Sequence, residues 1–217
     1  MSEYHKIQTI FKRDMDSPQK ALMEGKWTLP EFEYLANNRW EFTEKVDGTN
    51  IRVAVAPDGS VVFGGRTDNA QIPTPLIARL QEYFMPITMQ QRLAAQFPEG
   101  AVLYGEGYGG KIQGGSKTYG PKQDFVLFDV SVGKWWLGRE AVNAIAAQFG
   151  LRAVPALGFG TLHNAVAMAK DGFKSTWGDF WAEGIVARPV VELKTRSGAR
   201  VIAKIKHRDF YNGGSDK

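Results

Sequence analysis

The stretch EFTEKVDGTNIRVAV, from Glu41 to Val55, contains a lysine and an acidic turn directly before an apolar strand. Apolar residues alternate from Ile51 to Val55, as they do in a strand with one buried face. Asp47-Gly48 is a dipeptide typical of turns. Taken alone, Lys45 is best explained as a solvated charge, because lysines are mostly exposed. The alternative is a nucleophile that the turn positions.

The strand is followed by PDGS and then by VVFGGR, which together predict a hairpin. With Asp58-Gly59 at its tip, this hairpin places Arg66 opposite Ile51. We therefore expect Arg66 to return to the base of the hairpin, where it lies beside Asn50 and the turn that follows Lys45.

Two further stretches are predicted strands that carry candidate binding groups. AVLYGEGYGG reads as a strand ending in a glycine-rich loop, with Glu106 in that loop. DFVLFDV, from Asp124 to Val130, has the apolar character of a buried strand and contains Phe128. Taken singly, Glu106 is a loop acid and Phe128 a core residue.

The spacing of apolar residues predicts helices in Thr74–Phe84, in GREAVNAIAAQFG and in HNAVAMAK. Residues 1–40 read as an irregular entry to the fold, with Trp27 and Trp40 as core anchors. Many short strands, few helices and no regular alternation of the two predict an α+β fold with antiparallel sheets.

The last part of the chain predicts a second hairpin, formed by EGIVARPVVEL and ARVIAKIKHRDF around the loop TRSG. In this register Lys206 faces Ala187. Because directly opposed residues share a face and side chains alternate along a strand, Glu183, Lys204 and Lys206 should project from one face of the sheet. Arg188 should point away from that face. Taken alone, the two lysines could simply protect an edge strand from pairing.

The composition narrows the class of protein. Hydrophobic residues make 43% of the 217 residues, which is enough for a core, and no cysteine is present. The lack of cysteine excludes disulfides, thiolate metal sites and a cysteine nucleophile. A formal net charge of +4 is compatible with a polyanionic partner. Because no apolar run approaches a membrane span or a signal peptide, we expect a cytoplasmic protein without a membrane partner.

Together the two hairpins present groups suited to phosphoryl chemistry. A lysine is nucleophilic only when it is neutral, and nearby positive charge favours the neutral form. Arg66, Lys204 and Lys206 would supply that charge near Lys45. The same cations would stabilise a transferring phosphoryl group.

Acidic and aromatic side chains complete a candidate nucleotide site. Glu106 and Glu183 would hold a ribose or a hydrated Mg²⁺, since hard cations prefer oxygen ligands. Phe128 could stack on a base. Each residue alone has a simple structural explanation, but their joint occurrence favours a site.

Five blocks of the chain resemble motifs of the covalent nucleotidyltransferases, the family of ATP-dependent ligases and capping enzymes. EKVDGTN resembles motif I, KxDG; LYGEGYGG and DFVLFDV resemble the segment that includes motif III; EGIVARP resembles motif IV and AKIK motif V, KxK. They occur in the family order between Glu44 and Lys206. The resemblance implies an ATP-grasp-like nucleotidyltransferase fold of antiparallel sheets flanked by helices, with a nucleotide cleft between the sheets.

The resemblance also indicates a subfamily. DNA ligases and capping enzymes usually have arginine where this chain has Asn50, whereas DGTN together with RTDN and YGE is similar to the type 2 phage RNA ligases. This implies that Lys45 attacks the α-phosphate of ATP, with Mg²⁺ or Mn²⁺, and becomes lysyl-AMP. AMP then passes to a nucleic-acid 5′-phosphate and a 3′-hydroxyl displaces it, which joins RNA ends in RNA repair in a bacterial or phage-infected cell.

The matching positions take their expected roles from the same resemblance. Asp47 belongs to the turn that aims Lys45. The residues expected to bind the nucleotide are Glu44 and the backbone of Val46 at adenine, Asn50 and Arg66 at the phosphates or at the incoming 5′-phosphate end, Glu106 at the ribose, Phe128 over the base, Glu183 at the metal or ribose, and Lys204 and Lys206 at the α-phosphate.

The C-terminal side of the motifs departs from the larger ligases, which add an OB-fold or helical domain there. We expect residues 1–217 to form a single adenylyltransferase domain without that addition. The protein would then be a minimal ligase or would seal ends with an accessory protein. The alternatives are an ATP-dependent DNA ligase, a guanylyltransferase, and a nucleotide-binding or nucleic-acid-binding module without turnover.

Overall fold

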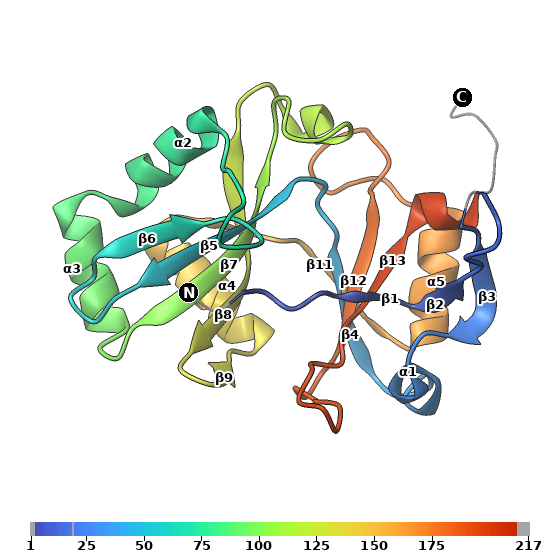
Figure 1. The fold of residues 1–217 in the computed structure, drawn as a ribbon. Helices are drawn as coiled ribbons and strands as arrows, with labels where there is room; N and C mark the ends of the chain where they lie inside the picture. Colours follow the sequence, from blue (N-terminus) through green and yellow to red (C-terminus); the bar gives the residue numbers. More distant parts are fainter. Residues whose placement is uncertain (1–2, 19, 212–217) are drawn as a thin grey trace. The chain divides into compact units, whose positions relative to one another are not determined.

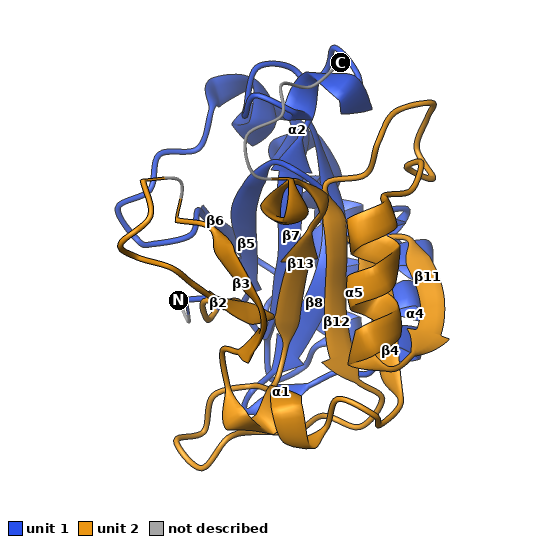
Figure 2. Cartoon of the chain, turned by 90° about the vertical axis from the view of Figure 1, so that its right-hand side faces the viewer, with its two compact units in different colours: residues 1–4, 46–154 blue, residues 5–45, 155–217 orange. Residues whose placement is uncertain are grey.

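The computed structural model describes residues 3–18 and 20–211, which divide into two compact units. Of the described residues, unit 1 contains Glu3, Tyr4 and Val46–Val154, and unit 2 contains those within His5–Lys45 and within 155–211 (Figure 2). The chain passes from unit 2 to unit 1 directly after Lys45. Whether both units act as one domain stays a prediction.

Unit 1 is built on a six-stranded sheet (Figure 1). The strand order is β10-β8-β7-β5-β6, with β9 paired to β8. All pairs are antiparallel except β10 with β8. The strands are β5 (Thr49–Val55), β6 (Val61–Gly64), β7 (Ala101–Tyr108), β8 (Asp124–Val132), β9 (Trp135–Trp136) and β10 (Arg152–Ala153).

The helix predicted at Thr74–Phe84 is α2, and its apolar face is part of the core of unit 1. Its Leu76, Leu80 and Phe84 are fully buried together with Ile51 of β5. The other helices of this unit are α3 (Ile87–Gln96), α4 (Arg139–Phe149) and the short 3₁₀ helix η1 (Ser116–Tyr119). Helix α4 was predicted, whereas α3 was not.

Unit 2 contains a five-stranded sheet of order β1-β13-β12-β4-β11 and a two-stranded sheet of β2 and β3 (Figure 1). Helix α5 carries Leu162, Ala165 and Ala169 in the core of this unit, as the stretch HNAVAMAK predicted. The elements are β1 (Gln8–Thr9), β2 (Phe11–Arg13), β3 (Leu22–Trp27), α1 (Pro30–Tyr34), β4 (Trp40–Glu44), β11 (Ala156–Gly160), α5 (Leu162–Asp171), β12 (Gly184–Pro189), β13 (Ala203–Lys206) and η2 (His207–Phe210).

The predicted α+β class with largely antiparallel sheets is confirmed, but the prediction that residues 1–40 are irregular is wrong. That segment forms three strands and a helix, and β1 pairs parallel with β13. Trp40 is a fully buried core anchor, whereas Trp27 is half-buried. Among the described residues, no helix combines the length and apolar character needed to cross a membrane.

Both predicted hairpins form, but in other registers. In the first hairpin Val55 pairs with Val61, whereas the predicted register, with Arg66 opposite Ile51, would pair it with Val62. Strand β6 ends at Gly64. In the second, Lys206 faces Gly184 rather than Ala187. Near the tip of the second hairpin, Val201 N donates to Leu193 O, a pairing out of step with the β12–β13 ladder. The connection between β12 and β13 therefore contains residues that do not follow the register of the ladder, and the hydrophobic pattern does not reveal them.

Candidate functional site

The strongest cluster of predicted site residues lies in unit 2, around the carboxylate of Glu183. Lys45 follows β4, and its backbone N–H donates to Gly184 O at 2.9 Å. Its Nζ atom lies 2.7 Å from Glu183 Oε2, and Lys206 Nζ lies 2.6 Å from Glu183 Oε1. Three residues distant in sequence are therefore brought together as predicted.

The carboxylate of Glu183 is ionised between two lysines. Its side chain is 9% exposed, and burial by itself raises the pKa of a carboxyl group. The charges of Lys45 and Lys206, and the hydrogen bonds from both amines, outweigh that effect and hold the pKa of Glu183 below its ordinary value. Removing either lysine would leave part of this buried charge uncompensated.

Gly184 explains how Glu183 reaches this position. In the observed register Ile185, Ala187 and Ile205 face the core of unit 2, so strict alternation would also turn residue 183 toward that core. Gly184 has φ +152°, and a Cβ there would lie 2.1 Å from Ile205 O. A glycine therefore interrupts the alternation, and Glu183 turns toward Lys206 instead.

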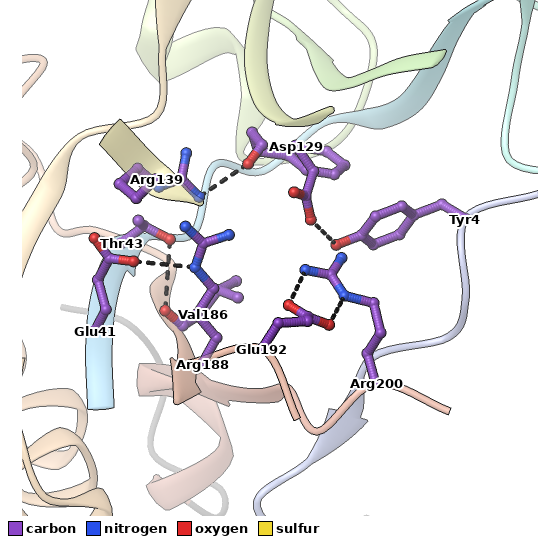
Figure 3. Close-up of polar contacts among 10 residues, drawn as sticks. Tyr4, Glu41, Thr43, Asp129, Arg139, Val186, Arg188, Glu192 and Arg200 are labelled. Atoms are coloured by element: carbon purple, nitrogen blue, oxygen red, sulfur yellow. Dashed lines mark hydrogen bonds and ion pairs between the residues drawn. The ribbon is translucent and has the colours of Figure 1, made fainter. Parts of the chain in front are cut away.

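The register change also alters which residue shares the face of the lysines. Lys204 lies opposite Val186, so Lys204, Lys206 and Arg188 share one face, and the prediction that Arg188 points away from it is wrong. Arg188 Nε contacts Glu41 Oε2 of the neighbouring β4 at 3.0 Å (Figure 3).

Glu44, predicted to lie at adenine, is buried and engaged by a loop of unit 2. Its carboxylate accepts hydrogen bonds from Ser175 Oγ and from both the backbone N–H and the Oγ1 of Thr176. Ser175 Oγ in turn accepts from Trp177 N at 3.1 Å. The side chain of Glu44 thus fixes the loop at residues 175–177, and its contact with adenine stays a prediction.

In unit 1 two of the predicted residues, Asn50 and Glu106, lie on the face of the sheet opposite the core. Asn50 lies directly opposite Glu106 on the neighbouring strand, so the two share a face. Ile51 is part of the apolar core on the other face. The sheet therefore presents an amide and a carboxylate side by side, as expected for groups that bind one ligand.

Glu106 lies within β7 rather than in a glycine-rich loop, so that prediction is wrong. Its neighbours Gly105 and Gly107 face the core, where a Cβ would lie 2.2 Å from Phe125 Cε2 and 2.3 Å from Leu76 Cδ2, respectively. The two glycines make room for large core side chains and do not form a loop. The glycine-rich motif was therefore misleading about local structure, and the contact of Glu106 with a ribose stays a prediction.

Arg66 is exposed in the turn beyond β6, and another arginine holds that turn in place. Arg52, fully buried, donates from Nε to Gly65 O at 2.6 Å and from Nη2 to Asp68 Oδ1 at 2.9 Å. These bonds bracket Arg66 on both sides. Arg52 was missed, although its alternation with Ile51 already placed it on the face of Asn50.

The turn after Lys45 packs closely in unit 1. Val46 is buried, and the backbone N–H of Asp47 donates to Tyr119 Oη at 3.3 Å. A Cβ on Gly48 would lie 2.1 Å from Gly107 O, so the turn can approach β7 only with glycine there. The DG dipeptide thus has a structural role besides that of forming a turn.

Phe128 occupies an irregular position in β8. Leu127 pairs with Gly105 whereas Asp129 pairs with Tyr104, so Phe128 is the extra residue of a β-bulge. It is not part of the apolar core cluster, and the centroid of its ring lies 5.0 Å from the centroid of the Tyr4 ring. Tyr4 Oη also donates to Asp129 Oδ2 at 3.0 Å (Figure 3). Bulges often redirect side chains beside functional sites.

The described residues around Glu183 supply only part of the ligand set that a metal ion needs. Among residues 3–18 and 20–211, no group of three or more His, Asp or Glu side chains could hold a metal ion. Glu183 offers one carboxylate flanked by two lysines. Mg²⁺ commonly binds through one or two carboxylates, substrate phosphates and water, so these residues fit a metal that arrives with a phosphate ligand.

Comparison with known proteins gives one family match. A family model described as RNA ligase matches residues 38–206, a span that includes every predicted site residue. No curated protein matches the chain.

Solved structures share the fold. The RNA ligase of Naegleria gruberi with PPi is 23% identical, covers 82% of this chain and 52% of its own, and has a TM-score of 0.63. A variant of that ligase with ATP and Mn is 20% identical, covers 83% and 54%, and also has a TM-score of 0.63. This chain spans about half the length of those proteins.

Proposed function

The chain belongs to the RNA ligase family, and we propose that it is an ATP-dependent RNA ligase that acts through a lysyl-AMP intermediate on Lys45. The observation that carries the proposal is the cluster in which the amines of Lys45 and Lys206 lie 2.7 and 2.6 Å from one buried carboxylate. The similar ligase of Naegleria gruberi was solved with ATP and Mn, which supports the same nucleotide and metal here.

In the first step the amine of Lys45, once it has lost the proton that pairs it with Glu183, attacks the α-phosphorus of ATP as a neutral nucleophile. A nitrogen–phosphorus bond forms, the bond to the bridging oxygen of the β-phosphate breaks, and pyrophosphate leaves with the electron pair. The amine loses one proton to solvent. Lys204 and Lys206, on the face of β13 opposite the core of unit 2, would stabilise the charge of the transferring group.

Mg²⁺ or Mn²⁺, held by Glu183 together with phosphate oxygens, would neutralise negative charge on the nucleotide. Glu106 and Phe128 would bind ribose and base, and Asn50 and Arg66 would bind phosphates. Asn50 and Glu106 are directly opposed in the sheet, which supports a shared ligand for these two.

In the later steps the 5′-phosphate of an RNA end attacks the phosphorus of lysyl-AMP and releases the amine of Lys45. A 3′-hydroxyl then attacks that 5′-phosphorus, forms the phosphodiester and releases AMP. The presence of asparagine at position 50 favours RNA over DNA. An accessory protein could aid the grip on RNA ends.

The test is incubation with ATP and Mg²⁺ or Mn²⁺, followed by intact mass and peptide mapping. We expect one AMP on Lys45, no adduct in Lys45→Ala, and a normal adduct in Lys12→Ala, which alters an exposed lysine outside the cluster. An adduct that survives in Lys45→Ala would contradict the proposal, and ATP binding without an adduct would favour a binding module.

Strands with 5′-phosphate and 3′-hydroxyl ends test the substrate. Sealing of RNA or RNA-containing nicks is expected, whereas sealing of all-DNA nicks alone would identify a DNA ligase. A GMP adduct in place of AMP would indicate a guanylyltransferase.

A further inference from the structure

A second cationic feature of unit 2 is a pocket of about 300 Å³ beside β13. Its charged lining residues are Lys6, Arg13, Lys204, Lys206, Arg208 and Asp209. Five of these are cations and one is an acid, so the lining has an excess of positive charge. Only two of the cations belong to the KxK motif.

The single acid of the lining does not neutralise this excess. Asp209 Oδ2 is engaged by Arg13 Nη2 at 2.6 Å, and Arg13 also donates to Lys20 O at 3.1 Å. Lys206 is held by Glu183. Neither Lys6 nor Arg208 has an acidic partner among the described residues. Like charges that converge on one pocket repel one another, and an anion would relieve that repulsion.

The backbone holds the N-terminal part of this pocket against the motif lysines. Strand β1 pairs parallel with β13, with Thr9 opposite Lys204. Ile10 N also donates to Lys204 O at 3.2 Å. Lys6 lies two residues before β1, and Arg13 ends β2 of the two-stranded sheet, so the pairing of β1 with β13 holds the segment that carries both cations beside Lys204 and Lys206.

We propose that this pocket binds the β- and γ-phosphates of ATP, which leave as pyrophosphate. The proposal rests on the proposed function, in which Lys204 and Lys206 contact the α-phosphate. Because those two lysines also line the pocket, the phosphates next along the nucleotide would lie against Lys6, Arg13 and Arg208. The volume corresponds to about ten water molecules, which is room for a small polyanion and its hydration.

The shape of the feature favours a small anion over an RNA strand. Proteins that bind single strands use a positively charged groove that follows the backbone, with aromatic side chains on which bases stack. The lining here contains no aromatic side chain, and its five cations surround a volume of about 300 Å³. The alternative ligand of the pocket is a phosphate group of RNA, and the experiment below distinguishes RNA from pyrophosphate.

The test uses the full chain and the double variant Lys6→Ala/Arg208→Ala, which alters two exposed residues outside the KxK motif. The matched control is Lys12→Ala/Arg196→Ala, also two exposed cations, neither of which lines the pocket. Titration calorimetry with pyrophosphate measures binding without any catalysis. The double variant removes two cations that would donate charge-assisted hydrogen bonds to the anion, and such hydrogen bonds are stronger than those between neutral groups. We therefore expect the double variant to bind at least about tenfold more weakly, at about 1.4 kcal/mol per factor of ten.

A second measurement follows the reaction itself. Adenylylated protein is treated with pyrophosphate, which should reverse the first step and release ATP. We expect the double variant to need at least about tenfold more pyrophosphate for half-maximal reversal, while it transfers AMP to a 5′-phosphate RNA at the rate of the control. Loss of RNA transfer with unchanged reversal would assign the pocket to RNA instead.

Unchanged pyrophosphate affinity in the double variant would overturn the proposal. Circular dichroism and the melting temperature establish that both double variants remain folded. If the unmodified chain forms no lysyl-AMP, the proposed function fails, but calorimetry still decides whether the pocket binds pyrophosphate. The two failures are therefore distinguishable.

Discussion

Lys45 Nζ lies 2.7 Å from Oε2 of Glu183, a carboxylate that is only 9% exposed. The other oxygen of Glu183 lies 2.6 Å from Lys206 Nζ. One buried acid therefore joins the end of β4 to β13 within unit 2. The same acid sets the local charge balance, because it is the negative group between two cations.

Replacing Glu183 with glutamine should make the stability of the protein less dependent on pH in the acidic range. The pKa of Glu183 is below its ordinary value of 4.5 in the folded chain, so the unfolded chain binds this proton more readily. The resulting stabilisation is present above about pH 4.5 and is lost as the pH falls through the folded-state pKa. Urea unfolding between pH 7 and pH 3 should show that the free energy of unfolding falls less toward low pH in Glu183→Gln than in the unmodified chain.

The matched control for this measurement is Glu99→Gln, which alters an exposed acid of unit 1. Its acid profile should follow that of the unmodified chain. An acid profile of Glu183→Gln identical to that control would show that the ion pairs do not shift the titration of Glu183.

Replacing Arg52 with methionine should destabilise unit 1 and disturb the turn that carries Arg66. The side chain of Arg52 is fully buried and donates to Gly65 O and to Asp68 Oδ1. A buried carbonyl left without its donor costs about 1–3 kcal/mol of unfolding free energy. Asp68→Asn alters the partner, whose side chain is 69% exposed, and should cost at most about 1 kcal/mol.

Chemical denaturation measures both variants, and the KM for ATP in self-adenylylation reports on Arg66. We expect Arg52→Met to raise this KM more than Asp68→Asn does. Equal stability of the two variants would mean that the buried hydrogen bond to Gly65 contributes little.

Much of the fold was predictable where local periodicity is strong. The bounds Thr74–Phe84 of α2 were predicted because its apolar residues recur at helical spacing, and the hairpin of β5 and β6 because PDGS separates two apolar runs. The cluster of Lys45, Glu183 and Lys206 was predicted because its residues belong to ordered motifs. These signals lie in short stretches of sequence.

The errors arose where long-range packing decides the structure. Glu106 was assigned to a loop because its flanking glycines resemble a turn, whereas the side chains of Phe125 and Leu76 fill the space beside them. The register of β12 and β13 depends on an irregular connection that has no sequence period. Glu183 reached Lys206 through Gly184 and not through the predicted alternation, so that prediction was correct for the wrong reason.

Replacing Gly48 with alanine should destabilise the turn after Lys45. An added Cβ would lie 2.1 Å from Gly107 O, a backbone atom that cannot move without shifting β7. Overpacking of this kind typically costs about 1–3 kcal/mol. Gly114→Ala is the matched control, because an added Cβ meets nothing within 4 Å there, and it should stay within about 0.5 kcal/mol of the unmodified chain.

Thermal and urea unfolding measure the two glycine variants, and intact mass after incubation with ATP measures adduct formation. We expect Gly48→Ala to form the adduct more slowly because the turn aims Lys45. Equal adduct rates in Gly48→Ala and Gly114→Ala would contradict that role.

Replacing Glu44 with glutamine separates a structural role from a direct contact with adenine. The carboxylate accepts three hydrogen bonds from Ser175 and Thr176, and it is 1% exposed. Glutamine has one carbonyl oxygen and an NH₂ group, so at least one of these donors would lose its acceptor, at a cost of about 1–3 kcal/mol. We therefore expect lower stability in urea unfolding together with a higher KM for ATP.

Ser175→Ala provides the control, because it removes a donor to the carboxylate and leaves Glu44 unchanged. If Glu44 acts by fixing the loop, the effects of Glu44→Gln and Ser175→Ala on stability should be less than additive, since both disrupt one hydrogen-bonded network. If Glu44 acts only at adenine, Glu44→Gln would raise the KM for ATP at unchanged stability. A double-mutant cycle on urea unfolding therefore decides between the two roles, and additive effects would exclude the shared network.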